Sequence, residues 1–100
     1  MTAELSGVTF AVPDLIASAA LMIHTRGQSL IEITREVERF VREAGAKAGV
    51  VLLYMRHTSA SLLIQENADP DVQAEGIYVA EHRARAHRRE IMLQFVGCRE

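Results

Sequence analysis

Apolar residues in the first third of the chain fall into short runs separated by turn residues. Residues 8–12 are rich in β-branched and aromatic side chains and are bounded by Gly7 and Pro13, which predicts a strand. The next apolar run, residues 17–25, is followed directly by the turn sequence Arg26-Gly27-Gln28. That turn favours a strand over a helix for the run before it.

A helix is predicted after a short return strand at residues 30–33. Thr34 stands where an N-cap hydroxyl accepts from the first free amides of a helix. Four apolar residues then recur at the spacing i, i+3, i+4 and i+7, which places them on one face of a helix. They are Val37, Phe40, Val41 and Ala44. Gly45 is expected to end the helix in the left-handed conformation.

Four further apolar runs predict strands in the second half of the chain. Residues 49–55 form a continuous apolar run rich in Val and Leu, which predicts a strand buried on both faces at the centre of the sheet. Residues 62–64, 77–80 and 91–96 are shorter strands, and the basic segment 82–89 is expected to join the last two as an antiparallel hairpin. The pattern therefore predicts an α+β fold with two layers, a mostly antiparallel sheet and a helix packed on one face.

Composition limits the class of protein. A chain of 100 residues forms one domain, and 11 Lys+Arg against 13 Asp+Glu give a net charge of -2, with no general attraction to nucleic acid or anionic membranes. The longest uncharged run, residues 15–23, is too short to span a bilayer. Glu4 and Asp14 precede the first basic residue, Arg26, unlike the pattern of a secretory signal. The single cysteine, Cys98, is expected to be a small apolar filler and favours a reducing, cytoplasmic location.

A first polar cluster, Arg56-His57-Thr58-Ser59-Ala60-Ser61, directly follows the 49–55 run. Histidine is suited to general acid–base catalysis near neutral pH, so His57 is a candidate for proton transfer. The three hydroxyl side chains beside it are candidates to bind phosphate oxygens. The alternative interpretation is a turn in which these hydroxyls bond their own backbone.

A second cluster is acidic. Glu66, Asn67, Asp69 and Asp71 place oxygen ligands within six positions, a composition that can hold a hard cation such as Mg²⁺. The alternative is that Asp69-Pro70 opens a short helix whose positive end favours acidic residues. Gly76 follows within two turns, so such a helix would be marginal. This alternative leaves Glu66 and Asn67 unexplained.

A third cluster is basic. It contains His82, Arg83, Arg85, His87, Arg88 and Arg89. In strand geometry the odd-numbered members share one face, which predicts a local anion site; the alternative is a solvated hairpin tip. Nucleic-acid binding is disfavoured because no aromatic residue interleaves with the arginines. His82 and His87 stand five apart without a thiol pair, unlike a zinc signature.

Three strings of this sequence resemble the YjbQ-like family, often labelled secondary thiamine-phosphate synthase. They are TRGQSLIEITREVERFVREAG, RHTSASLLIQENADPDV and GIYVAEHRARAHRRE. The resemblance covers about residues 17–97, so the chain divides into an N-terminal extension, 1–16, and a YjbQ-like domain, 17–100. The domain is shortened, because residues 71–73 run directly into residues 74–77 where family members continue through a helix, an acidic stretch and further strands.

The resemblance implies a homotrimer with a polar pocket formed by the HTSAS and EHR segments. It also implies a transferase reaction in which a pyrimidine diphosphate condenses with a thiazole phosphate and releases pyrophosphate. That reaction needs cationic and hydroxyl donors for the leaving diphosphate and usually Mg²⁺. On this chain the resemblance assigns proton transfer to His57 and His82, phosphate binding to Thr58, Ser59, Ser61, Asn67 and Arg83, and the metal to Glu66 and Asp69.

The missing internal segment changes the functional expectation. We expect synthase activity to be weak or lost, because a thin core has lost buried area and part of the pocket. The alternative is a non-catalytic oligomerisation module or a phosphate-binding module. Loss of strands is also expected to leave free sheet edges on residues 62–64 and 77–80, one of which residues 8–12 would occupy.

Overall fold

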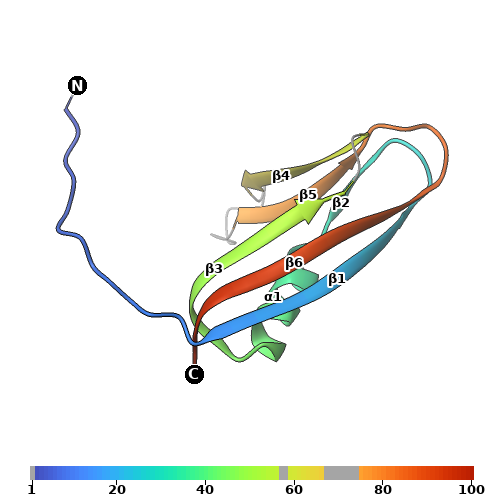
Figure 1. Cartoon of the computed structure of the whole chain (residues 1–100). Helices are drawn as coiled ribbons and strands as arrows, with labels where there is room; N and C mark the ends of the chain where they lie inside the picture. Colours follow the sequence, from blue (N-terminus) through green and yellow to red (C-terminus); the bar gives the residue numbers. More distant parts are fainter. Residues whose placement is uncertain (1, 57–58, 67–74) are drawn as a thin grey trace.

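The structure, a computed structural model, describes residues 2–56, 59–66 and 75–100 and is built mainly from antiparallel strands (Figure 1). In chain order the elements are β1 (Leu15–Thr25), β2 (Ser29–Glu32), α1 (Thr34–Glu43), β3 (Ala46–Met55), β4 (Ala60–Glu66), β5 (Glu75–Glu81) and β6 (His87–Arg99). They form two three-stranded sheets, with the orders β1-β6-β3 and β2-β5-β4. The predicted α+β class is confirmed, although the strands divide between two sheets instead of forming one.

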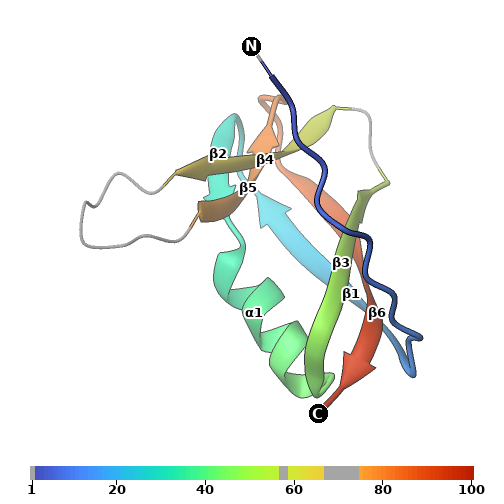
Figure 2. The same ribbon diagram turned by 90° about the vertical axis from the view of Figure 1, so that its left-hand side faces the viewer.

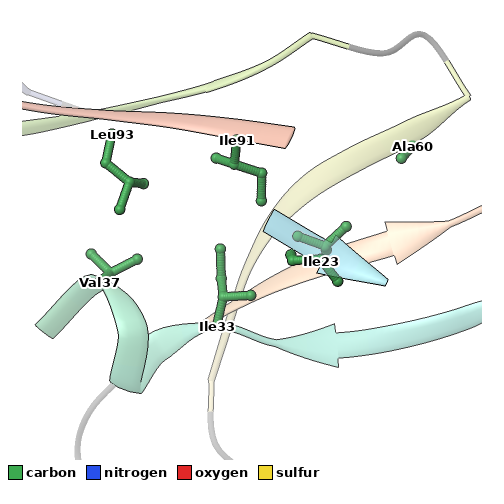
Figure 3. Close-up of a cluster of buried hydrophobic side chains, with 7 residues drawn as sticks. Ile23, Ile33, Val37, Ala60, Ile91 and Leu93 are labelled. Atoms are coloured by element: carbon green, nitrogen blue, oxygen red, sulfur yellow. The ribbon is translucent and has the colours of Figure 1, made fainter. Parts of the chain in front are cut away.

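One hydrophobic core holds the two sheets and the helix together. Alternate residues of β6, Ile91 and Leu93, are 0% and 3% exposed. Figure 3 shows Ile33 and Val37 facing them from the start of α1. In Figure 2, α1 and the β2-β5-β4 sheet lie on the same side of the β1-β6-β3 sheet. The latter sheet therefore has an inner face in the core and an outer face directed away from it.

The predicted helix is confirmed at its end but begins differently. Gly45 follows the helix with φ 69°, the left-handed conformation expected of it. The N-cap, however, is Ile33, because its side chain is 2% exposed in the core and its N–H donates to the carbonyl of Ile77. Thr34 is instead the first helical residue, and its hydroxyl accepts from the N–H of Ile77 at 2.8 Å and donates to Glu32 at 3.0 Å. The hydroxyl thus ties α1 to β5 instead of capping the helix.

The prediction that residues 49–55 form the sheet centre, buried on both faces, is wrong. Among the described strands, β3 pairs only with β6, and it therefore forms an edge of its sheet. Val50, Leu52 and Tyr54 are 57%, 52% and 64% exposed, while the residues between them face the core. The continuous run misled because the outward face of β3 is apolar as well. The central strand is β6.

Two glycines allow β3 and β6 to lie close together beneath an aromatic ring. Gly49 and Gly97 are opposite each other in the register. A Cβ on Gly97 would collide with the carbonyl oxygen of Ala48 and would lie 2.7 Å from Cζ of Phe95. Gly49 has φ 154°, a conformation that side chains rarely adopt. The close approach of β3 and β6 at this pair therefore requires glycine on both strands.

The predicted hairpin between residues 77–80 and 91–96 is wrong. β5 pairs with β2 and β4, whereas β6 pairs with β1 and β3, so residues 82–86 carry the chain from one sheet to the other. β6 pairs with the whole length of β1, in a continuous register from Leu15↔Gly97 to Thr25↔His87. Residues 77–80, expected to present a free edge, lie in the central strand β5 and are paired on both sides, whereas residues 62–64 lie in β4, which pairs only with β5 among the described strands and keeps the expected free edge.

The strand predicted at residues 8–12 is also wrong, and these residues fill no sheet edge of their own chain. Leu5, Val8, Phe10 and Val12 are 92%, 70%, 92% and 88% exposed. The segment extends away from the two sheets (Figure 1). The helix predicted from Asp69-Pro70 lies outside the described residues. None of the described helices is long and apolar enough to cross a membrane.

Candidate functional site

A buried ion pair joins the end of β5 to the start of β6. The side chains of Glu81 and Arg89 are 0% and 3% exposed. Arg89 donates twice to the carboxylate, from Nε to Oε1 at 2.8 Å and from Nη2 to Oε2 at 2.6 Å. The Thr25 hydroxyl of β1 donates to Oε1 at 2.7 Å, and the N–H of Arg83 donates to Oε2 at 3.1 Å. Four donors thus surround one carboxylate.

Both members of this pair are held in their charged forms. The hydrogen bonds from Arg89 keep the pKa of Glu81 well below its ordinary value against the opposing effect of burial, and those from Thr25 and the N–H of Arg83 lower it further. The hydrogen bond to Glu81 in turn raises the pKa of Arg89. Because each charge is matched and hydrogen-bonded, the pair forms a rigid floor linking the two sheets.

Arg89 connects this floor to the polar cluster that opens β4. Its Nη2 donates to Oγ of Ser59 at 2.8 Å. The carbonyl of Ser59 accepts from the N–H of His82 at 3.2 Å. Further out, Oγ of Ser61 and Nε2 of His82 are hydrogen-bonded at 3.0 Å. The HTSAS and EHR segments, distant in sequence, therefore meet in space.

The structure places only some of the predicted site residues. Ser59, Ser61, His82 and Arg83 gather at this meeting point. The others lie outside the described residues: His57, Thr58, Asn67 and Asp69 altogether, and Glu66 as to its side chain, although its backbone ends β4. The catalytic, phosphate-binding and metal-binding roles assigned to these residues remain predictions.

The prediction that the odd-numbered basic residues share one exposed face is wrong. Residues 82–86 form no strand, and Arg83 and Arg85 project into solvent from the turn. Together with His87 they line a small pocket at the tip of the molecule. Arg89 instead points into the core. The basic segment therefore separates into a solvent-facing group and one structural arginine.

Thr25 and Arg89 are the supporting residues that sequence reasoning missed. Arg89 has the same alternation as Ile91 and Leu93, so extending that strand backwards by one step would have directed its side chain into the core. A buried arginine requires a paired acid. Glu81 is the first residue of the EHR segment, so this signal could have identified the pair.

The exposed part of the site is suited to binding an anion. A serine hydroxyl and an imidazole can both donate hydrogen bonds to phosphate oxygens, and Arg83 adds positive charge one residue from His82. A metal does not fit the described side chains, since none of their His, Cys, Asp and Glu residues gather in a group of three or more able to hold an ion. The predicted metal ligands Glu66 and Asp69 lie outside these described side chains, so Mg²⁺ binding stays a prediction.

Comparison with known proteins agrees with the sequence strings. The family described as UPF0047 protein YjbQ-like matches residues 19–88. UPF0047 protein YugU of Bacillus subtilis (strain 168) is 42% identical over 69 residues, covering 63% of this chain and 52% of the relative. UPF0047 protein sll1880 of Synechocystis is 50% identical over 52 residues, covering 52% of this chain and 35% of the relative.

A third relative, UPF0047 protein MJ1081 of Methanocaldococcus jannaschii, is 34% identical over 55 residues, covering 55% of this chain and 40% of the relative. The chain thus spans about half, or less, of the length of the curated relatives it matches. No solved structure matches it. Because the family match covers more than half of the chain, the protein belongs to the YjbQ-like UPF0047 family.

Proposed function

We propose that the protein binds a phosphorylated small molecule where the Ser59–Ser61 and Glu81–Arg83 segments meet. One observation carries the proposal: the exposed Ser61–His82 hydrogen bond lies next to a buried, fully paired Glu81–Arg89 floor. Because Glu81 is neutralised by Arg89, it does not repel an anion bound above it. The donors lie on β4 and directly after β5, two strands that pair with each other, so little entropy is lost when they bind.

The reaction proposed for this site is the one that the family label implies. The pyrimidine diphosphate would lose pyrophosphate as its methylene carbon bonds to the thiazole nitrogen. Arg83, Ser59 and Ser61, with Thr58 and Asn67, would stabilise the leaving diphosphate. His82 and His57 would transfer protons, and Glu66 and Asp69 would hold Mg²⁺. Since the chain spans only part of its relatives' length, we propose that turnover is weak or lost.

A non-catalytic anion-binding module is the second candidate function. Arg83, Arg85 and His87 line one pocket, and Arg83 directly follows His82 of the Ser61–His82 pair. This arrangement supplies charge and hydrogen-bond donors without requiring a base or a metal. We further propose the homotrimer that the family resemblance implies and, because Cys98 is a free thiol, a cytoplasmic location.

Pyrophosphate binding tests the site directly. Thermal unfolding of the full chain would be followed with rising pyrophosphate, with and without Mg²⁺, because a ligand of the native state raises the unfolding temperature. Ser61→Ala removes one donor to a charged ligand, and we expect about tenfold weaker binding. Ser18→Ala, the same change at an exposed position of β1, is the matched control. Equal affinity in the Ser61 and Ser18 variants would overturn the proposed site.

A turnover assay with both phosphorylated substrates separates the two candidate functions. Detectable pyrophosphate release that is lost in His82→Ala and retained in His24→Ala, an exposed histidine of β1, supports the synthase. Pyrophosphate binding without turnover supports the anion-binding module.

A further inference from the structure

The N-terminal arm, residues 2–12, holds large apolar side chains out of contact with the rest of the chain. Val8, Phe10 and Val12 are 70%, 92% and 88% exposed, and Leu5 is 92% exposed. Val8, Phe10 and Val12 stand at every second position, so in an extended arm they share one face. A row of exposed apolar side chains on a soluble chain marks an interaction segment.

The root of the arm is fixed at the end of β6. The N–H of Asp14 donates to the carbonyl of Gly97 at 2.9 Å, and the N–H of Arg99 donates to Oδ1 of Asp14 at 3.0 Å. The thiol of Cys98 lies 3.6 Å from the carbonyl oxygen of Val12. Beyond this point the arm leaves the sheet (Figure 1). Its direction, and not only its exposure, is therefore away from its own sheet.

The free edge of β3 offers a matching surface. β3 pairs with β6 and with no other strand among those described, so its second row of backbone N–H and C=O groups is unpaired. Its outer face carries Val50, Leu52 and Tyr54 at every second position, each more than half exposed. The other edge of the same sheet, β1, has only small residues beside Ile16 over the same length. An apolar edge of this kind is a template for strand addition.

We propose that the arm of one copy adds as a strand to the free edge of β3 in a second copy. Three alternate apolar residues of the arm then lie beside three of β3, with Phe10 next to Leu52 whichever way the strands run. The arm contains one charge, Glu4, and β3 contains one of opposite sign, Lys47, so no like charges meet.

The acceptor is a second copy because the arm's own β3 is on the wrong side of the sheet. The arm continues from β1, and the order β1-β6-β3 places β6 between that strand and β3. The arm also lies outside residues 19–88, which the family match covers. Arm exchange is thus a property of this chain and does not depend on the proposed function.

Disulfide trapping between two full-length variants tests this contact. Both carry Cys98→Ser to remove the native thiol; one adds Phe10→Cys with a peptide tag, and the other adds Leu52→Cys with a different tag. Residues opposite each other on paired strands have Cα atoms close enough for a disulfide. After mixing and mild oxidation we expect a heterodimer carrying both tags. Thr9→Cys replaces Phe10→Cys in the matched control, because that side chain is on the opposite face of the arm.

The yields decide the proposal. About tenfold more heterodimer from the Phe10 variant than from the Thr9 variant supports arm exchange, since strand alternation directs the two thiols to opposite faces. Equal yields from the two variants, or no heterodimer, would each overturn it. Sedimentation gives a second measurement without cysteines. Phe10→Asp should reduce the association state more than Thr9→Asp does, and identical sedimentation of the two variants would overturn the proposal.

Discussion

Ile91 of β6 is the residue whose truncation should weaken the fold most clearly. Its side chain is 0% exposed and faces Ile33 and Val37 across the core (Figure 3). Ile91→Ala deletes three carbon atoms from the place where both sheets and α1 meet. The surrounding residues come from several elements, so no single side chain can relax to fill the space.

The magnitude follows from burial and cavity formation. Three buried methylene equivalents at about 0.8 kcal/mol each contribute ~2.4 kcal/mol. A residual cavity of roughly 50 Å³ adds about 1 kcal/mol at ~24 cal/mol per Å³. We therefore expect Ile91→Ala to lower the free energy of unfolding by about 3–4 kcal/mol, a large part of the ~5–15 kcal/mol typical of a domain.

Ile16→Ala is the matched control, because it is the same change on the strand that pairs with β6. Ile16 is 68% exposed, so only about a third of the transfer term applies and we expect a loss of ~0.8 kcal/mol. Urea unfolding of both variants at neutral pH measures the difference, and with m near ~1–3 kcal/mol/M the Ile91 midpoint should fall by about 1 M or more. Equal losses in the two variants would refute the assignment of Ile91 to the centre of the core.

Three further changes test the close approach of β3 and β6 at Gly97 and the buried Glu81–Arg89 pair. Gly97→Ala places a Cβ against β3 and should destabilise by about 1–3 kcal/mol, whereas Gly7→Ala, with open space around it, should not; denaturation curves compare them. Because the pKa of Glu81 is lowered from 4.5, its contribution to stability is complete above pH 4.5 and is lost as pH falls towards the folded-state pKa. The free energy of unfolding, measured as pH is lowered, should therefore fall less steeply in Glu81→Gln than in the unchanged chain. An equal slope in the two proteins would contradict this. Arg89→Met leaves the buried Glu81 carboxylate without its cation and should lower the melting temperature far more than Arg39→Met at an exposed pair; similar losses would exclude a structural role for Arg89.

Sequence patterns predicted elements better than their neighbours in space. The strand at residues 17–25 and the helix ending before Gly45 depend on local spacing, and both are confirmed. The place of β3 in its sheet was not predictable in the same way, since Val50, Leu52 and Tyr54 give its solvent face the composition of a core face. Periodicity can show that two faces are apolar, but it cannot show which neighbour covers each face.

The candidate site also combines a part that depends on one pair of neighbouring strands with a part that depends on contacts between the two sheets. Its upper part is set by the register of one hairpin: Ala60 pairs with Glu81, and this brings Ser59 and Ser61 beside His82. The β4–β5 register is formed although the connection between the two strands is short. The buried Glu81–Arg89 pair beneath it is not determined by local sequence, because Thr25 and Arg89 come from the other sheet. A shift of β5 by one residue against both β2 and β4 would turn Glu81 towards solvent and leave Arg89 buried without a partner, so the ion pair favours the one register in which the exposed donors converge.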